Sequence, residues 1–368
     1  MPQTVVGVND PKAVRRWATS LATDTEKASY WSKFIGTGQN NIVERKVELE
    51  DDAGDTVQFD LSMRMRGGMT LGDNRVEGSA EGLTFYTDEV KIDQARKGAS
   101  AAGRMSRKRT LHNLRRIARD RTSEYMAQWI DEGFFVYLSG DNDLSAINQD
   151  NVFTQAFAGN AIQAPDSEHI LYGGSATSKG TITTADKMSV AFLERVAVKP
   201  KMMNATNPNV VRMSPVTVEG GKRFIVLMSP FQSHDLRTET GDLSWAKISQ
   251  ALATSEGRNS PICRGGMGMI NNLVLHEHES VRRWNNYGTG NNLPGARALL
   301  LARQAGVVAY GSGGNGSRMS WVEKLTDADN QVEIYCGVIM GMKKTRFDGL
   351  DFGVCALDTY CKDPNVPA

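Results

Sequence analysis

The sequence has few cysteines, no long apolar run and almost no net charge, and each absence excludes a class of protein. Its four cysteines form no Cys-x-x-Cys pair and no zinc spacing, so we expect buried apolar residues or free thiols rather than a disulfide framework. No run of eighteen apolar residues is present, so no membrane-spanning helix is expected. The first residues lack the basic and apolar regions of a signal peptide. A net charge of +1 means that only local charge clusters can indicate a partner.

The composition is that of a soluble globular protein. The chain has 368 residues, enough for two or three domains, with 40% hydrophobic and 23% charged residues. Helical and strand-like patterns are mixed along it without a regular strand–helix–strand alternation. This mixture predicts an α+β fold.

The most informative stretch is residues 54–94, which reads as a long two-stranded hairpin. Its first limb alternates apolar and polar residues with the period of two that marks a strand with one apolar face. Glycines and an asparagine within 67–82 let the chain reverse, and the second limb returns with a bulge expected near Thr87 and Asp88. An isolated hairpin is marginal in water, so its apolar face should lie on another surface; two strands of an ordinary sheet are the alternative. The apolar residues of the first limb are Val57, Phe59, Leu61, Met63 and Met65.

The N-terminal stretch, residues 10–34, has the pattern of a helical arm. Asp10 can cap a helix, and Pro11 suits the first helical position. The arm carries aromatic residues that could pack on the chain's own body or on a neighbour. They are Trp17, Tyr30, Trp31 and Phe34.

A strongly basic segment follows the hairpin. Ten lysines and arginines lie between Arg96 and Arg121, opposed only by Asp120. The segment leads into the longest expected helix, residues 105–138, which has one buried stripe. Its cations lie mostly off that stripe, so they form either a face for phosphates or a solvated face that pairs with acidic neighbours. The candidates for facing DNA are Arg104, Arg107, Lys108, Arg109, Arg115 and Arg116.

The rest of the chain gives further elements but no active site. Consecutive Ser233, His234 and Asp235 cannot form a catalytic triad, and His276 with His278 lacks a third metal ligand. We therefore expect no enzyme, no metal and no cofactor, with a metal enzyme at the two histidines kept as a rival interpretation. The expected elements are loops at 140–180, a helix at 184–203 capped by Thr183 or Thr184, a hairpin at 216–228, helices at 230–237 and 245–252, an apolar run at 296–310, and strands at 331–340 and 352–360.

Several short motifs carry a family resemblance through their order and spacing. They are Trp31-Ser32-Lys33-Phe34, Gly67-Gly68, Gly72-Asp73, Glu77-Gly78, the run from Val90 to Arg96, Pro230 with Asp235-Leu236-Arg237, and Gly266-Met267-Gly268 with the run from Asn271 to Glu277. Together they resemble the major capsid protein family of N-4-like tailed phages, a branch of the HK-97-like capsid fold. Residues 141–180 do not align with this pattern.

The resemblance implies a division of the chain into four parts. It implies an N-terminal arm at 1–45, an extended hairpin called the E-loop at 46–95, a peripheral domain with a long spine helix at 96–183 and 321–368, and an axial domain at 184–320. The E-loop would reach over an adjacent subunit. This supplies the surface that the alternating pattern demands.

The same resemblance implies a structural function. The chain would be a major capsid protein that self-assembles into pentamers and hexamers of an icosahedral shell around double-stranded DNA. It would be assembled in the host cytoplasm and reside in the virion, with separate scaffold, portal and decoration proteins and non-specific contact with DNA. The alternative is a nucleic-acid-binding protein that uses residues 96–121. The inter-subunit candidates are Phe59, Leu61, Met63, Arg64, Met65, Arg66, Asp73, Arg75 and Glu77 on the E-loop, and Trp17, Tyr30, Trp31 and Phe34 on the arm.

Overall fold

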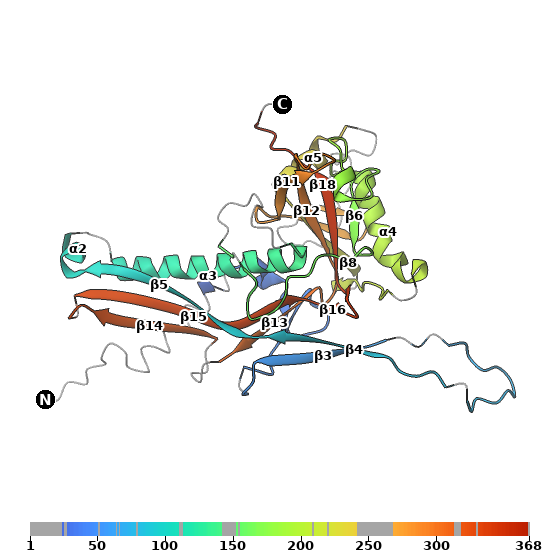
Figure 1. Ribbon diagram of the computed structural model, residues 1–368, viewed down its shortest axis with the longest axis horizontal. Coiled ribbons are helices and arrows are strands. Elements are labelled where there is room, and N and C mark those ends of the chain that lie inside the picture. The colour runs from blue at the N-terminus through green and yellow to red at the C-terminus, as the bar shows by residue number, and fades with distance from the viewer. Residues whose placement is uncertain are drawn as a thin grey trace.

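The protein consists of a flat arm, an upright domain over one end of the arm, and a narrow hairpin that extends beyond it (Figure 1). The computed structural model describes residues 24–366 except 26–27, 51, 64, 66, 79, 110–112, 142–151, 154, 208–209, 219–220, 241–267, 313–317 and 329. Two large sheets organise these residues, and helices pack on both. The mixture of helices and sheets agrees with the α+β class.

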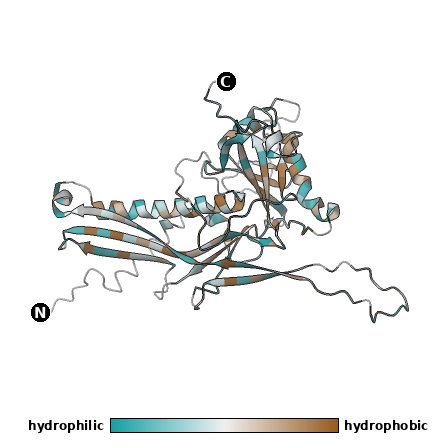
Figure 2. Ribbon diagram, viewed as in Figure 1, coloured by the Kyte–Doolittle hydropathy of each residue, from teal (hydrophilic) through white to brown (hydrophobic). Residues whose placement is uncertain are grey.

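A six-stranded sheet forms the arm. Its strands follow the order β1-β2-β13-β15-β14, and β5 also pairs with β15. Their bounds are β1 Ile35–Gly36, β2 Val43–Lys46, β5 Asp93–Gly103, β13 Gly306–Gly311, β14 Met319–Thr326 and β15 Gln331–Lys344. The 14 residues of β15 pair antiparallel with β5, β13 and β14, so this strand joins the whole sheet. Figure 2 shows apolar and hydrophilic residues alternating along β14 and β15, as a sheet with one covered face requires.

The long helix of the arm begins later than the sequence pattern suggested. One helix over 105–138 was expected, but the structure has α2 at Arg104–Arg109 and α3 at Leu114–Ser139. The two are separate because Asn113 adopts an extended conformation and its side chain accepts a hydrogen bond from the Arg116 amide at 3.2 Å, which caps a new helix. Gly140 ends α3 in the left-handed region with φ 66°.

An eight-stranded sheet forms the upright domain. Its order is β6-β18-β12-β8-β10-β9, with β11 on β12 and β7 on β8. The bounds are β6 Ile170–Tyr172, β7 Val216–Val218, β8 Gly221–Met228, β9 Gly268–Ile270, β10 Leu273–Glu277, β11 Arg283–Tyr287, β12 Leu293–Leu301 and β18 Val354–Tyr360. Residues Phe224–Met228 of β8 are all buried, which confirms the expectation for this continuous apolar run.

Two helices accompany this sheet. Helix α5, Pro230–Thr238, lies where the sequence predicted it, with Ser229 and Gln232 forming a capping box. Helix α4, Val190–Thr206, starts later than expected, because Ser189 rather than Thr183 or Thr184 caps it by accepting a hydrogen bond from the Phe192 amide. The helix expected at 245–252 lies outside the described residues.

The boundary expected between residues 320 and 321 does not separate the two sheets. Strand β13, expected with the axial part, pairs with β15 in the arm. Strand β18, expected with the peripheral part, pairs with β12 in the upright domain. The chain therefore passes between the arm and the upright domain more often than the expected four-part division allows.

Smaller elements complete the fold. They are the hairpin strands β3 Thr56–Ser62 and β4 Phe85–Lys91, the short ribbon β16 Arg346–Phe347 with β17 Leu350–Asp351, and the 3-10 turns η1 Tyr30–Lys33 and η2 Lys179–Thr181. The region at 140–180, expected to be loops, also contributes β6 and packs Phe153 and Phe157 against Trp129 of α3.

Candidate assembly interface

The base of the hairpin rests on its own subunit. Val57 and Val90 face each other across the two strands, and both are buried against Val307 and Ala309 of β13. Along β3 the expected alternation is present, with Gln58, Asp60 and Ser62 exposed and the residues between them covered to different degrees. Phe59 is half-buried and contacts the ring of Phe347 with 6.1 Å between ring centroids. The apolar face of the first limb therefore begins as an internal contact.

The inward face of the second limb carries a buried carboxylate. Asp88 is buried, forms an ion pair with Lys343 of β15, and accepts a hydrogen bond from the Arg346 amide at 3.0 Å. The expected bulge at Thr87 and Asp88 is wrong, because β3 and β4 pair in one unbroken register. The apolar pattern changed register there because a charged residue, Asp88, occupies an inward position, whereas Phe85 faces out.

The distal part of the hairpin is exposed and rich in apolar side chains. Five apolar side chains in this part of the hairpin are mostly exposed to solvent. The exposed fractions are 65% for Met65, 89% for Met69, 74% for Leu71, 64% for Val76 and 61% for Leu83. An exposed apolar group of this kind usually marks an interaction surface. Sequence analysis selected Met65 but not the other four, because the tip has no periodic pattern.

Three charged candidates near the tip form no ion pair with the rest of the described subunit. Asp73 is exposed, and Arg75 and Glu77 pair with each other at the surface. Met63 and Leu61 are half-buried at the end of the paired region. Arg64 and Arg66 lie outside the described residues.

The aromatic residues before β1 belong to the interior of their own subunit. Trp31 and Phe34 are 0% and 1% exposed and pack near Phe134 and Phe135 of α3. A carboxylate oxygen of Asp131 on α3 accepts a hydrogen bond from the Tyr30 amide at 2.8 Å, which fixes the segment on the helix.

This burial corrects part of the sequence interpretation. Trp31 and Phe34 have no surface left for a neighbouring subunit, so their expected inter-subunit role is replaced by an internal one. Tyr30 is half-buried, and Trp17 lies outside the described residues.

The two histidines considered as metal ligands sit among aromatic rings. The ring of His278 stacks on that of Phe135 with 4.9 Å between the ring centroids. The centroids of the His278 and Tyr30 rings are 4.2 Å apart. Nδ1 of His278 accepts a hydrogen bond from the Ser280 amide at 3.1 Å. Burial and the nearby Lys33 ammonium lower the pKa of His278 to about 4. Within the described residues no group of three potential metal ligands is present, and the aromatic packing accounts for the position of His278.

The basic segment is divided between three elements. Arg96 and Lys97 lie on β5, Arg104, Lys108 and Arg109 are exposed on α2, and Arg116 is exposed on the first turn of α3. Arg119 and Arg121 are engaged in ion pairs with Asp24 and Glu124. The side chains of Arg107 and Arg115 lie outside the described residues. Of the described cations in this segment, Arg104, Lys108, Arg109 and Arg116 thus lie at the distal end of the arm, where Figure 1 places α2 and the start of α3.

A family model described as phage capsid protein matches residues 5–363, which is nearly the whole chain. The chain belongs to the phage capsid protein family. The capsid protein is 25% identical over 374 residues to the major capsid protein of Pseudomonas phage KPP25, covering 94% of each chain.

Two solved structures show the same fold. The capsid of Ralstonia phage GP4 is 51% identical, with a TM-score of 0.85 over 100% of both chains. The capsid of cyanophage Pam1 is 19% identical, with a TM-score of 0.69 over 91% of this chain and 93% of that chain. The protein is therefore a tailed-phage major capsid protein with the HK-97-like fold, and it is part of the virion. Among the described residues, no helix is long and apolar enough to cross a membrane.

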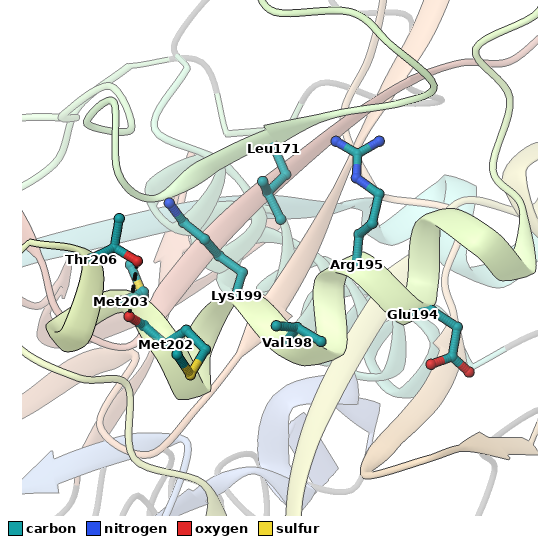
Figure 3. A pocket seen from close by; sticks show the side chains of 8 residues that line it. All are labelled: Leu171, Glu194, Arg195, Val198, Lys199, Met202, Met203 and Thr206. Carbon is teal, nitrogen blue, oxygen red and sulfur yellow. Dashed lines mark hydrogen bonds between the residues drawn. The ribbon is translucent and has the colours of Figure 1, made fainter.

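The capsid protein also has a shallow hollow on α4 that sequence analysis missed. Its volume is about 510 Å³, and the half-exposed side chains of Val198 and Met202 line it together with Leu171 of β6. Figure 3 shows Arg195 and Lys199 at its edge. Lys199 pairs there with Glu168 at 3.1 Å. This surface has an apolar floor and a charged edge, which suits a packing contact rather than a chemical reaction.

Proposed function

We propose that this capsid protein self-assembles into pentamers and hexamers that close an icosahedral shell around double-stranded DNA. The observation that carries the proposal is the distal hairpin, whose apolar side chains are exposed in the single subunit. An isolated pair of strands is marginal in water, so this projection gains stability by lying on a second subunit. Closed rings of heterologous contacts would place one hairpin on each neighbour.

Many modest contacts of this kind add up to a strong shell. Covering one large apolar side chain contributes roughly 1.5–3 kcal/mol, and Met69, Leu71 and Val76 are exposed at the tip of each hairpin. Each subunit also repeats its contacts around the ring, so the effective concentration of the second and later contacts is high. The proposal assigns the hairpin an assembly role and assigns the protein no catalytic role.

The direct test places charge on the apolar face of the hairpin's first limb. The variant Leu61→Asp with Met63→Asp should remain a folded, soluble subunit but fail to form shells. A matched control is Gln58→Asp with Ser62→Asp, which adds the same charges to the exposed face of the same limb. Negative-stain microscopy and sedimentation give the yield of particles. Normal particles from the Leu61 and Met63 variant would refute the role of this face.

The partners of the shell belong to the same proposal. We propose that separate scaffold, portal and decoration proteins take part, and that the shell assembles in the host cytoplasm. Expressing the chain alone and together with candidate partner proteins from its phage, followed by microscopy, tests whether closed shells require them.

The alternative function, nucleic-acid binding through residues 96–121, has one supporting observation. Arg104, Lys108, Arg109 and Arg116 are exposed, as non-specific phosphate contact requires. It is weaker because Arg119 and Arg121 are already engaged in ion pairs. Filter binding of the unassembled subunit to DNA across a salt series measures this activity, and tight, steeply salt-dependent binding would favour it.

A further inference from the structure

The distal end of the arm presents a basic surface with apolar residues among its cations. Arg104, Lys108 and Arg109 on α2 and Arg116 on α3 are exposed. Beside them Met105 is 60% exposed and Ile117 is 42% exposed. Among the described residues, no carboxylate forms an ion pair with these four cations. We call these six residues the basic end.

An acidic turn of opposite charge lies elsewhere on the same chain. Residues 47–55, between β2 and β3, read Val-Glu-Leu-Glu-Asp-Asp-Ala-Gly-Asp and contain no cation. Glu48, Asp52 and Asp55 are exposed. Leu49 is buried against the base of the hairpin, and Glu50 pairs with Arg45 at 2.9 Å. The turn is therefore fixed on the subunit while the side chains of Glu48, Asp52 and Asp55 are exposed.

These two surfaces are separated within one subunit. In Figure 1, α2 lies at the far end of the arm, whereas the turn enters β3 at the base of the hairpin. The main contact of α2 within the subunit is with β5. Helix α2 lies on the same side of the arm sheet as α3 and the upright domain, whereas the turn leads into β3 on the opposite side (Figure 1). An ion-pair contact between them therefore requires two subunits.

We propose that the acidic turn of one subunit docks on the basic end of a second copy of this chain. The inference rests on the proposed function, because it names one of the contacts that would build the shell. It is a heterologous contact, in which two different surfaces of the same chain meet, so it can join subunits in series. Complementary charge would also set the register of the two copies before the apolar side chains close.

The composition of the basic end favours a protein over DNA as its occupant. Phosphate contact uses cations and gains nothing from Met105 or Ile117, whereas protein interfaces combine an apolar centre with a charged rim. The exposed Val47 next to Glu48 provides an apolar group on the acidic side. The near-zero net charge of +1 is consistent with two opposite surfaces that neutralise each other on assembly.

Charge exchange tests the contact. The first variant is Arg104→Glu, Lys108→Glu and Arg109→Glu, and the second is Glu48→Lys, Asp52→Lys and Asp55→Lys. Each alone should lower the yield of shells at least about tenfold, because like charges then face each other. A chain that carries both sets should recover to within about twofold of the original yield. The control Lys201→Glu with Lys222→Glu changes exposed cations of the upright domain and should assemble normally.

A second measurement does not depend on the charge-reversed variants folding. Raising the salt concentration from about 0.1 M to about 1 M shortens the screening length from roughly 10 Å to 3 Å, so assembly of the original chain should slow. The milder variant Arg104→Gln, Lys108→Gln and Arg109→Gln should lose most of this salt dependence. Salt-independent assembly, or an unchanged salt response in the milder variant, would overturn the proposal.

The remaining outcomes separate this inference from the proposed function. If the first variant assembles normally but retains less DNA, the occupant is DNA and the inference is wrong, while the shell function stands. If both single sets fail and the combined chain does not recover, the two surfaces do not meet. If the original chain forms no particles with or without its partner proteins, the proposed function fails and this inference fails with it.

Discussion

Arg297 and Asp358 form a buried bidentate ion pair between the neighbouring strands β12 and β18 of the upright domain. Arg297 Nε and Nη2 donate to the two carboxylate oxygens of Asp358 at 2.7 and 2.8 Å. Its third nitrogen, Nη1, donates to the carbonyl of Ser139, the last residue of α3, at 3.0 Å. One side chain therefore connects β12, β18 and the end of the long helix.

Removing one partner of this pair should destabilise the subunit strongly. The variant Arg297→Met leaves the Asp358 carboxylate buried without a counter-ion, which costs about 3–5 kcal/mol. Urea unfolding of the unassembled subunit, followed by tryptophan fluorescence, measures the loss. The double variant Arg297→Met with Asp358→Leu removes both charges and should recover part of it. A single variant as stable as the original chain would contradict the assigned role.

His278 should make the subunit less stable in mild acid. Its pKa is about 4 in the folded protein, lowered by burial and by Lys33, against about 6.5 in the unfolded chain. Between these values the unfolded chain binds the extra proton, so the free energy of unfolding falls as the pH drops from about 6.5 to about 4. The full effect is about 3 kcal/mol.

The variant His278→Gln isolates this effect from the acidic groups that titrate in the same range. The difference in unfolding free energy between the two chains should change with pH between about 4 and 6.5 and be constant above about 7. Parallel pH profiles for the two chains would show that His278 does not titrate as described.

The ion pair between Asp88 and Lys343 should hold the hairpin at a fixed angle to the arm. Asp88→Asn removes the charge that Lys343 contacts and weakens the link between β4 and β15. Hydrogen exchange of the β3 and β4 amides should become at least about tenfold faster, because local opening becomes easier. Glu89→Gln removes only an exposed pair with Lys91 and should change little. Equal exchange rates in both variants would argue against the anchor.

Gly341 should tolerate no side chain because the hairpin crosses it closely. A Cβ added there would lie 1.9 Å from the carbonyl oxygen of Lys91, at the end of β4. Gly341→Ala should therefore lower stability by about 1–3 kcal/mol or more in thermal unfolding. The control Gly68→Ala, at a position with no atom within 4 Å of the added Cβ, should be near neutral. Similar melting temperatures for the two variants would disprove the close crossing.

The sequence predicted local elements well where a single face decides the pattern. The alternation in β3 and the continuous burial of residues Phe224–Met228 in β8 follow directly from the spacing of apolar residues. The sequence-based prediction was wrong where a buried polar residue has a partner far away in the sequence. Asp88 faces inward because Lys343, 255 positions away, neutralises it, and no local pattern contains that information.

The pairing of distant strands and the ends of helices were also difficult to predict, because they depend on contacts that the local sequence pattern does not contain. The assignment of β18 to the upright domain depends on its pairing with β12, not on its own composition. The start of α3 depends on one side-chain cap at Asn113 within a stretch that is otherwise compatible with helix. At the candidate interface, Met69, Leu71 and Val76 have no spacing that distinguishes an exposed tip from an ordinary turn.

The continuity of β4 and β5 has a mechanical consequence. The second limb of the hairpin runs through Ile92 into β5, whose residues pair antiparallel with β15 from Asp93 onward. A pull on the hairpin tip would therefore load the β5–β15 ladder in shear, so that many hydrogen bonds resist together instead of peeling apart one by one. In a lattice of such subunits, tension on the hairpin would pass through β5 to β15. Because β15 also pairs with β13 and β14, it would distribute this force over the whole sheet of the arm.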